Sequence, residues 1–244
     1  MMTLKEQFVV EAVREAVELV EQGNTVRVLD LGCGTANYAP VLLKKFPTVE
    51  YVGVEPIKAS FDAATENLQG IPNTKLHFRL GYDSIPDEEE SSFDLVLSLS
   101  ALEHIKQLER FIALSAKYVK PKGLLVHRYD LGHAVHPHSM KERFHVWLGN
   151  NFPQVLPERQ FVRYVSEEEV VTIYEKLGVA PMKTTYHQMP NMKALEKMLK
   201  ETNSTAIDEV FAWEMKHQDT FAMLPTNERE KIFPTLAVWG IKDC

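Results

Sequence analysis

The feature that most constrains the fold is a short apolar run that ends in an acid and two glycines. Residues 26–31 are β-branched or aliphatic apart from one arginine and Asp30, which is the pattern of a buried strand. Gly32 and Gly34 follow, and glycine lets the chain turn sharply and leaves bare main chain for a ligand. Apolar residues within 38–43 then recur with helical spacing. A strand, a glycine turn and a helix form a nucleotide-binding βα unit.

The spacing of the glycines argues against a dinucleotide. A dinucleotide fingerprint has a third glycine three residues after the second, where this sequence has Asn37. Asp30 lies at the end of the first strand, where we expect it to receive a cationic ammonium or sulfonium group. S-adenosylmethionine carries both cations. Glu55 ends a second apolar run at 49–55, near the spacing of about 20 residues at which an acid holds ribose hydroxyls. These residues favour S-adenosylmethionine over NAD.

Four stretches in chain order carry a family resemblance: residues 29–36, 53–56, 81–83 and 93–98. They resemble the first motif, the second-strand acid, the adenine-side loop and the fourth strand of the class I S-adenosylmethionine-dependent methyltransferases. The resemblance covers residues 25–130 well and the remainder loosely. It implies an α/β fold with a doubly wound, mostly parallel seven-stranded sheet of the Rossmann-like methyltransferase type. It also implies helical cap insertions and S-adenosylmethionine as the cofactor.

The resemblance further implies which residues bind the cofactor. They are Asp30, Gly32, Cys33, Gly34, Glu55, Pro56, Tyr82, Asp83 and Ser98. Either Tyr82 or Asp83 would lie at the adenine edge, where Asp83 can accept a hydrogen bond from the exocyclic amine. For Asp30 and Glu55 the alternative is that they cap the helices that follow them. Ala36 stands where the fullest family pattern has a third glycine.

Length and composition allow one α/β domain with a sizeable core. The chain has 244 residues, of which 45% are hydrophobic and 25% are charged, as is usual for soluble proteins. No apolar run approaches the roughly 18 residues of a membrane span, and the first residues do not resemble a signal peptide. Two cysteines give no disulfide framework, so we expect a cytoplasmic protein without a membrane partner. A net charge of −7 favours a small-molecule substrate over nucleic acid. The oligomeric state is not predicted.

The alternation of strand and helix patterns predicts a parallel sheet with right-handed crossovers. We expect a single methyltransferase domain over residues 1–244. Its parts would be an N-terminal helix (1–23), a cofactor-binding core (24–129), a substrate-cap insertion (130–165) and a C-terminal part of the sheet (166–244) with a helical insertion at about 190–231. The N-terminal helix would pack on the sheet or form a flap over the cofactor. The last strand, within 234–241, would be antiparallel.

Two histidines compete for the role of general base, because an imidazole has a pKa near the operating pH. His104 follows the fourth strand, beside the place where a methyl group would be passed, or it forms a structural hydrogen bond at a helix start. His133 lies with His136 and His138 in the insertion, the densest cluster of imidazoles in the chain. It would act as the base, bind substrate, or lie in a surface loop.

No metal site is predicted. One related group, the ubiquinone-pathway O-methyltransferases and small-RNA end methyltransferases, carries a Glu-x-x-Glu-His metal motif after the fourth strand. This chain has Ser100 at the first Glu, so only Glu103 and His104 remain, and two ligands are too few for a divalent site. The histidine cluster lacks a Cys or acid to complete a zinc tetrahedron. The acidic run at 87–90 is expected to be a solvated loop.

The remaining candidates have a functional and a structural interpretation. Three arginines in the insertion would pair with a substrate carboxylate or phosphate, or would simply be solvent-exposed side chains. They are Arg143, Arg159 and Arg163. Trp147 and Trp213 are expected to be core anchors rather than substrate platforms.

The residues together predict an in-line displacement in which a substrate oxygen, nitrogen or carbon attacks a sulfonium methyl. O- or N-methylation of a small molecule is favoured over C-methylation. The alternative is a module that binds S-adenosylmethionine or S-adenosylhomocysteine without transfer activity. An enzyme should have a closed pocket between Ser98 and the histidine-rich insertion, which such a module would lack. Aminopropyl transfer on the same fold would require an acid in place of Ser98.

Overall fold

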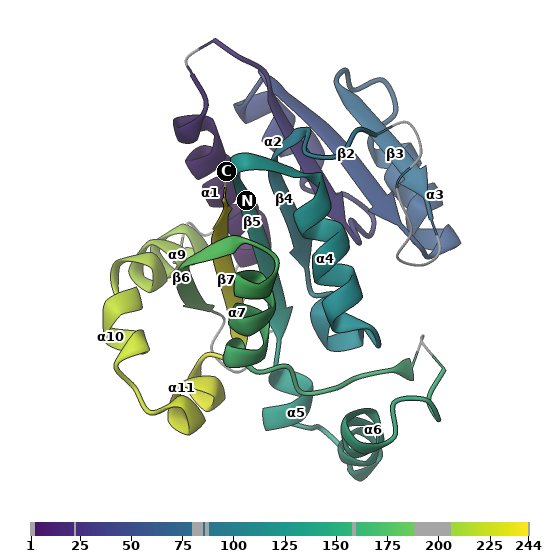
Figure 1. Ribbon diagram of the computed structural model, residues 1–244, viewed down its shortest axis with the longest axis vertical. Coiled ribbons are helices and arrows are strands. Elements are labelled where there is room, and N and C mark those ends of the chain that lie inside the picture. Colours follow the sequence, from purple (N-terminus) through teal and green to yellow (C-terminus); the bar gives the residue numbers. More distant parts are fainter. Residues whose placement is uncertain are drawn as a thin grey trace.

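The computed structural model describes residues 3–21, 23–79, 85, 88–157, 160–187 and 206–243. These residues form a seven-stranded sheet with the order β3-β2-β1-β4-β5-β7-β6 (Figure 1). Strands β3, β2, β1, β4 and β5 pair in parallel, whereas β7 is antiparallel to both β5 and β6. The expected doubly wound, mostly parallel sheet with an antiparallel last strand is confirmed.

The bounds of the elements follow the labels of Figure 1. The strands are β1 (Val26–Leu31), β2 (Val49–Glu55), β3 (Thr74–Phe78), β4 (Phe93–Leu99), β5 (Val119–Asp130), β6 (Val179–His187) and β7 (Thr235–Lys242). The helices are α1 (Leu4–Leu19), α2 (Ala39–Lys45), α3 (Lys58–Asn67), the 3-10 turn η1 (Leu102–His104), α4 (Leu108–Tyr118), α5 (Gly132–Val135), α6 (Met140–Asn151), α7 (Glu167–Lys176), α9 (Ala206–Lys216), α10 (Gln218–Ala222) and α11 (Thr226–Ile232). Within the described ranges, none of these helices has the length and apolar content needed to cross a membrane.

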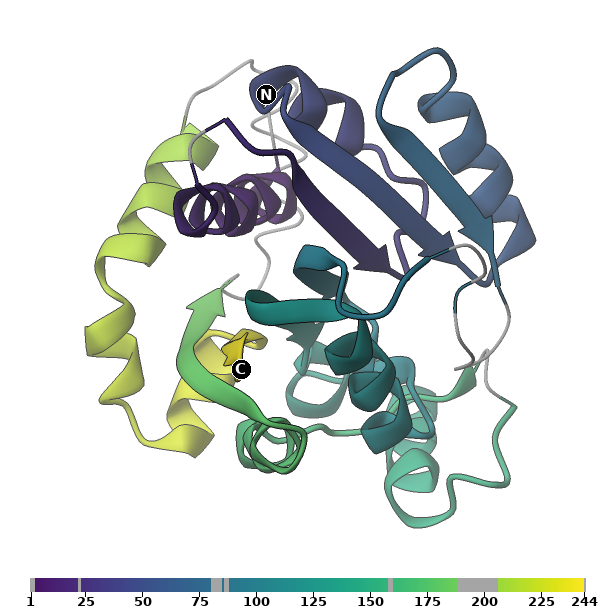
Figure 2. The same cartoon turned by 45° about the horizontal axis from the view of Figure 1, so that its top comes forward.

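Helices cover both faces of the sheet. Helices α1, α2 and α3 pack on one face, and α4 and α7 pack on the other, as Figure 2 shows from a second direction. Successive residues of a strand point to opposite faces, so Val28 packs with α1 while Leu29 packs with α4. A sheet that is buried on both sides has nearly continuous apolar strands, which explains the run at 26–31.

The N-terminal helix α1 packs on the sheet and does not form a flap. Its first turn is closed by a capping box, in which the Thr3 hydroxyl accepts from the Glu6 N–H and the Glu6 carboxylate accepts from the Thr3 N–H. Phe8 then packs edge-on against Trp239 of β7, with ring centroids 5.3 Å apart, and against His187 of β6 at 5.4 Å. These contacts link the start of the chain to the far end of the sheet.

The insertions gather at the carboxyl ends of the parallel strands. Helices α5 and α6 follow β5 and lie beyond its end, at the bottom of Figure 1. Within the expected cap at 130–165, residues 152–157 and 161–165 after α6 lie in no helix or strand. Helices α9, α10 and α11 connect β6 to β7 and form an arc beside the sheet. The first part of the predicted insertion at about 190–231 lies outside the described residues.

Two predicted boundaries are displaced. The alternation of residues 76–80 predicts a strand, which is observed at Thr74–Phe78, and the apolar spacing within 111–119 predicts a helix, which begins earlier, at Leu108. Each element begins before the apolar pattern, and for β3 the pairing of Thr74 with Tyr51 of β2 extends the strand in that direction.

The expectation that the acidic run at 87–90 is a solvated loop is wrong for Glu88. Only 2% of its side chain is exposed. Its carboxylate contacts Arg27 Nη2 at 2.8 Å, Lys75 Nζ at 2.7 Å and His77 Nε2 at 3.1 Å. These contacts outweigh partial burial and lower the pKa of Glu88. The Glu88 side chain therefore packs against the basic side chains of β1 and β3.

The expectation that both tryptophans are core anchors is also wrong. Trp147 is 51% exposed on the outer face of α6, where it stacks on Phe144 with ring centroids 5.9 Å apart. Trp213 of α9 is 43% exposed and packs beside Phe221 of α10. Helix α6 and the α9–α10 segment lie at the periphery, so only one side of each is covered.

We predict that His127 makes the stability of the fold depend on pH. His127 is fully buried, with Nδ1 2.6 Å from the Tyr174 hydroxyl and Nε2 3.1 Å from the Ser115 hydroxyl. Burial lowers the pKa of His127 to about 3. Between about pH 6.5 and pH 3 the unfolded chain therefore binds a proton that the folded protein does not, so the free energy of unfolding should fall as pH falls, by at most about 1.4 kcal/mol per unit from this group.

Urea denaturation of the wild type and His127→Gln from pH 7.5 to 4 measures this contribution. The variant should be less stable at neutral pH and lose part of the acid-side slope. His217→Gln, at the half-buried position between α9 and α10, is the control and should keep the wild-type slope. Parallel profiles for wild type and His127→Gln would contradict the prediction.

Candidate active site

The glycine turn after β1 is held against the end of β2. Gly32 and Gly34 have positive φ angles of 82° and 60°, the region that favours glycine. The N–H groups of Gly32 and Cys33 both donate to the Val54 carbonyl, at 2.8 and 3.1 Å. Cys33 is buried in the turn, and burial raises the pKa of its thiol. Ala36 also has a positive φ, of 49°, at the position where the fullest family pattern has glycine.

Glu55 fastens this turn a second time. Its Oε2 accepts from the Gly34 N–H and its Oε1 from the Ile57 N–H, both at 2.8 Å, and the residue is 4% exposed. Ile57 is the residue before α3, so the helix-capping interpretation of Glu55 is also partly correct. Each oxygen keeps a lone pair, so the carboxylate can still accept from ribose hydroxyls. Pro56, between the two, is exposed.

Asp30 is fully buried beneath the turn. Its Oδ2 accepts hydrogen bonds from the hydroxyls of Tyr38 and of Tyr51, the latter at 2.9 Å. Its Oδ1 has no hydrogen-bond partner in the described part of the chain. Burial raises the pKa of Asp30 to about 7, against the opposing effect of the Tyr51 hydrogen bond. The sequence analysis did not predict these two tyrosines, although Tyr51 lies on the neighbouring strand, paired with Val28.

Unpartnered acceptors occur along the same edge of the sheet. Besides Asp30, the Ser98 hydroxyl in β4 and Oε2 of Glu103 in η1 are buried without a hydrogen-bond partner among the described residues. Because β1 and β4 are parallel neighbours, these residues belong to one edge. Burial raises the pKa of Glu103 to about 8. The edge thus offers oxygen acceptors, which fit a ligand with an ammonium group and hydroxyls.

The two histidines that competed for the role of base lie together. His104 follows β4 in η1 and His133 follows β5 in α5, and their ring centroids are 5.9 Å apart in an edge-on arrangement. His104 Nδ1 is 3.0 Å from the Phe161 carbonyl oxygen, and burial lowers the pKa of His104. His133 Nδ1 is 2.6 Å from Oε1 of Glu142 in α6, a contact that the sequence did not indicate.

The rest of the histidine cluster has separate contacts. His136 Nε2 is 2.6 Å from the Lys231 carbonyl oxygen at the end of α11. The backbone N–H of His138 donates to Oε2 of Glu142 at 2.6 Å. In the ranges that the structure describes, no group of three or more His, Cys, Asp or Glu side chains is arranged to hold a metal ion.

Some predicted residues are placed elsewhere or lie outside the described ranges. Arg163 forms an ion pair with Glu169 of α7. Tyr82 and Asp83, the adenine-edge candidates, and Arg159 lie outside the described residues.

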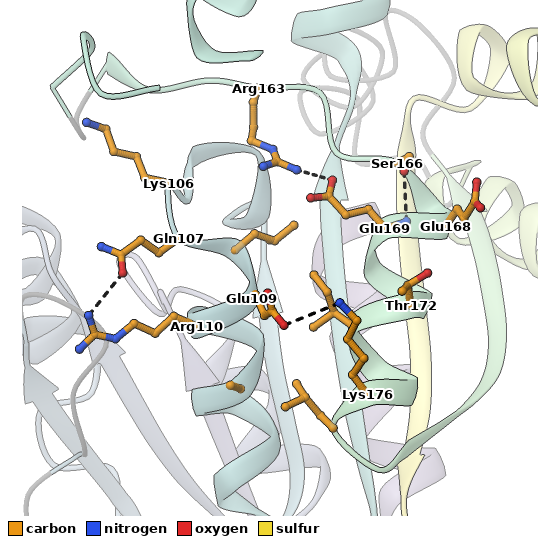
Figure 3. A pocket seen from close by; sticks show the side chains of 14 residues that line it. Lys106, Gln107, Glu109, Arg110, Arg163, Ser166, Glu168, Glu169, Thr172 and Lys176 are labelled. Atoms are coloured by element: carbon orange, nitrogen blue, oxygen red, sulfur yellow. Dashed lines mark hydrogen bonds and ion pairs between the residues drawn. The ribbon is translucent and has the colours of Figure 1, made fainter. Parts of the chain in front are cut away.

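An open groove of about 920 Å³ lies between α4 and α7 (Figure 3). Lys106, Arg163 and Glu169 border one part of it, and Glu109 of α4 faces Lys176 of α7 across it at 3.9 Å. Ser98 and the histidines of the insertion do not line this groove. It is therefore not the closed pocket that the sequence analysis expected beside the methyl position.

The fold and the glycine turn after β1 are those of a nucleotide-binding α/β protein. Comparisons with known proteins indicate which family it resembles. Residues 29–125 match the family profile of a methyltransferase domain. The chain is 28% identical over 122 residues to a ubiquinone biosynthesis O-methyltransferase of Bartonella tribocorum, covering 50% of this chain and 48% of that protein. It spans about half the length, or less, of the curated relatives it matches.

Solved structures show the same fold. A Haemonchus contortus phosphoethanolamine N-methyltransferase 2 in complex with S-adenosylmethionine has a TM-score of 0.63 at 16% identity, over 96% of this chain and 52% of that one. The CurJ carbon methyltransferase has a TM-score of 0.60 at 11% identity, over 98% and 54%. The chain is therefore similar in sequence to methyltransferases over half of its length or less, and it shares their fold.

We predict that replacing Asp30 by asparagine removes a pH-dependent loss of stability. The pKa of Asp30 is raised in the folded protein to about 7, so between about pH 4 and pH 7 the folded state holds a proton that the unfolded state has lost. The free energy of unfolding from this group should then fall as pH rises through that window, by at most about 1.4 kcal/mol per unit.

An amide has no proton to lose, so the stability of Asp30→Asn relative to wild type should increase from pH 4.5 to pH 7.5 in urea titrations. Asp62→Asn, on the exposed side of α3, is the control and should show no such trend. A constant difference between wild type and Asp30→Asn would contradict the prediction.

Proposed function

We propose that this protein transfers a methyl group from S-adenosylmethionine to an oxygen or nitrogen of a small molecule. The observation that carries the proposal is the pairing of His104 and His133 beyond the ends of β4 and β5. The glycine turn and Glu55 lie at the ends of β1 and β2 along the same edge. Open α/β sheets bind their ligands outside the carboxyl ends of the strands, so donor and acceptor would meet there.

The residues of the turn would hold the cofactor. Glu55 would accept from the ribose hydroxyls, because its carboxylate is fixed by two main-chain N–H groups and keeps free lone pairs. Asp30 and Ser98 offer buried acceptors that suit the ammonium end of the methionine part. Gly32 and Gly34 let the ligand lie against main chain. Tyr82 or Asp83 at the adenine edge remains a prediction from the family resemblance.

The protein's own contribution to the reaction would be alignment, exclusion of water and removal of a proton. S-adenosylmethionine supplies an activated methyl group, so little further activation is required. Holding the acceptor in line and accepting its proton are the steps for which residues are needed. His133 would be the base, and residues 130–165, including α5 and α6, would shape the substrate site.

The choice of acceptor atom rests on the relatives and on the histidines. The curated relative is named an O-methyltransferase, and one structural neighbour is an N-methyltransferase. Oxygen and nitrogen nucleophiles carry a proton that a base must remove, and an imidazole pair suits that task better than it suits mere cofactor binding. No observation favours the alternative of a module that only binds the cofactor.

Calorimetry and a transfer assay test the proposal. The purified protein should bind S-adenosylmethionine and S-adenosylhomocysteine but not NAD. Incubation of a small-molecule extract with methyl-labelled S-adenosylmethionine should give a labelled product. Binding of NAD without binding of S-adenosylhomocysteine would overturn the cofactor assignment, and binding without any labelled product would leave a binding module.

Glu55→Ala tests the cofactor site itself. Affinity for S-adenosylhomocysteine should fall by about 1.5–3 kcal/mol, the range for a hydrogen bond to a charged group. Glu50→Ala, on the same strand and exposed, is the matched control. Unchanged affinity in Glu55→Ala would mean that another residue holds the ribose.

His133→Ala should separate chemistry from cofactor binding. We expect unchanged affinity for S-adenosylhomocysteine and a kcat lower by about 10²–10⁴-fold if His133 is the general base. A smaller loss that appears mainly in KM would instead mean that His133 binds the acceptor. If His133→Ala and His136→Ala both turn over normally, the role of base would pass to His104.

A further inference from the structure

Helix α6 brings a carboxylate to His133. Glu142 occupies the first turn of α6, where its own N–H donates to the Ser139 hydroxyl at 3.1 Å. Its Oε1 is 2.6 Å from His133 Nδ1, and its Oε2 accepts from the His138 N–H at 2.6 Å. Partial burial opposes ionisation of Glu142, but the hydrogen bonds from His133 and His138 prevail and lower its pKa. The carboxylate is therefore ionised and held at both oxygens.

These contacts determine which nitrogen of each ring carries the proton. A carboxylate can only accept, so His133 must donate from Nδ1, and its Nε2 keeps a lone pair. The Phe161 carbonyl likewise can only accept, so His104 also donates from Nδ1. Both imidazoles thus have a basic Nε2, and the contacts of Nδ1 hold each ring in place.

The surroundings of the two rings differ in charge. His104 has a carbonyl as its partner, and the Glu103 carboxyl 4.0 Å from its Nε2 is buried with a raised pKa of about 8. His133 instead contacts an ionised carboxylate directly. A positive charge formed on His133 is consequently stabilised by that carboxylate, whereas the hydrogen-bond partner of His104 is the neutral Phe161 carbonyl. His133 is the ring suited to take a proton, and His104 is the ring suited to stay neutral beside it.

We propose that Glu142 is the positioning residue of the site: it fixes the Nδ1–H form of His133, directs Nε2 to the acceptor and stabilises the imidazolium. The inference rests on the proposed methyl transfer. As the acceptor oxygen or nitrogen bonds to the methyl carbon, the carbon–sulfur bond breaks and leaves its electron pair on sulfur. The proton of the acceptor moves to Nε2 of His133, and the carboxylate of Glu142 balances the new charge. Through Glu142, helix α6 therefore supports proton removal by His133 in addition to covering the proposed substrate site.

The state of the His133 ring can be measured without substrate. Two-bond ¹H–¹⁵N correlation spectra of ¹⁵N-labelled protein distinguish the two neutral forms, and the His133→Gln spectrum assigns the signals. We expect the Nδ1–H form in the wild type and in Glu142→Gln, whose amide oxygen still accepts. In Glu142→Ala the ring should change toward the mixture of a solvated imidazole. An Nε2–H ring in the wild type, or an unchanged ring in Glu142→Ala, would overturn the proposal.

Kinetics then test whether the contact between Glu142 and His133 contributes to turnover. On the acceptor found with labelled S-adenosylmethionine, Glu142→Gln and Glu142→Ala should lower kcat by about 10–100-fold, as the loss of a carboxylate partner does for metal-binding histidines, with KM little changed. Glu169→Gln is the matched control, because Glu169 has the same place in a Ser-capped first turn of α7. Wild-type kcat in both Glu142 variants would overturn the catalytic part of the proposal.

Two further measurements distinguish a structurally disturbed variant, or a failure of the proposed function, from a failure of the Glu142 proposal. Glu142→Ala also removes the acceptor of the His138 N–H, so the variant could disturb α6. The fluorescence of exposed Trp147 on α6 should therefore be the same as in the wild type, and this is checked before the kinetics are interpreted. Calorimetry with S-adenosylhomocysteine should give wild-type affinity in all Glu142 variants. If the wild type binds S-adenosylhomocysteine but methylates nothing, the proposed function fails, while the spectra still decide whether Glu142 positions His133.

Discussion

The carboxylate of Glu55 is the contact on which the arrangement of the site depends. It joins the glycine turn after β1 to the start of α3, because it accepts hydrogen bonds from the N–H groups of Gly34 and Ile57. The Val54 carbonyl accepts two further N–H groups of the same turn. Both βα connections are therefore fixed to each other, and the backbone that would surround a ligand is rigid before any ligand binds. Preorganisation of this kind lowers the entropy lost on binding.

The sheet was predictable because each of its strands is encoded by a short, local stretch of sequence. Each strand is a short apolar run, and the glycines and prolines that follow mark where it ends, so the order of elements follows from the sequence. The parallel alternation and the antiparallel β7 follow in turn from chain connectivity. Boundaries were less accurate, as at β3, since pairing with a neighbour decides where a strand begins. The prediction for the acidic run was wrong for a similar reason. The position of Glu88 is determined by ion pairs with basic residues on β1 and β3 that are distant in sequence.

The site was predicted in part for the same reason. Glu55 and the glycines belong to motifs, and the structure brings them together. Tyr38 and Tyr51 were missed because a tyrosine in an apolar run gives no sign of which acid it will face. The competition between His104 and His133 could not be decided from spacing alone. Parallel strands β4 and β5 end at one edge, so two residues that the sequence treats as alternatives become neighbours. Glu142 was missed because its role depends on how α6 folds back over α5.

Gly53 affects the chemical reactivity of the glycine turn after β1. It lies opposite Asp30, and a Cβ there would approach the Cys33 sulfur to 2.9 Å and Leu76 to 2.7 Å, so the absence of a side chain is what lets the sulfur sit inside. Burial of Cys33 raises the pKa of its thiol, and only the thiolate is a strong nucleophile. A sulfonium methyl donor is an alkylating agent, and a reactive sulfur beside it would be methylated in place of the acceptor. If the turn holds the methyl donor as proposed, Gly53 thus helps to keep the buried Cys33 thiol unreactive toward it.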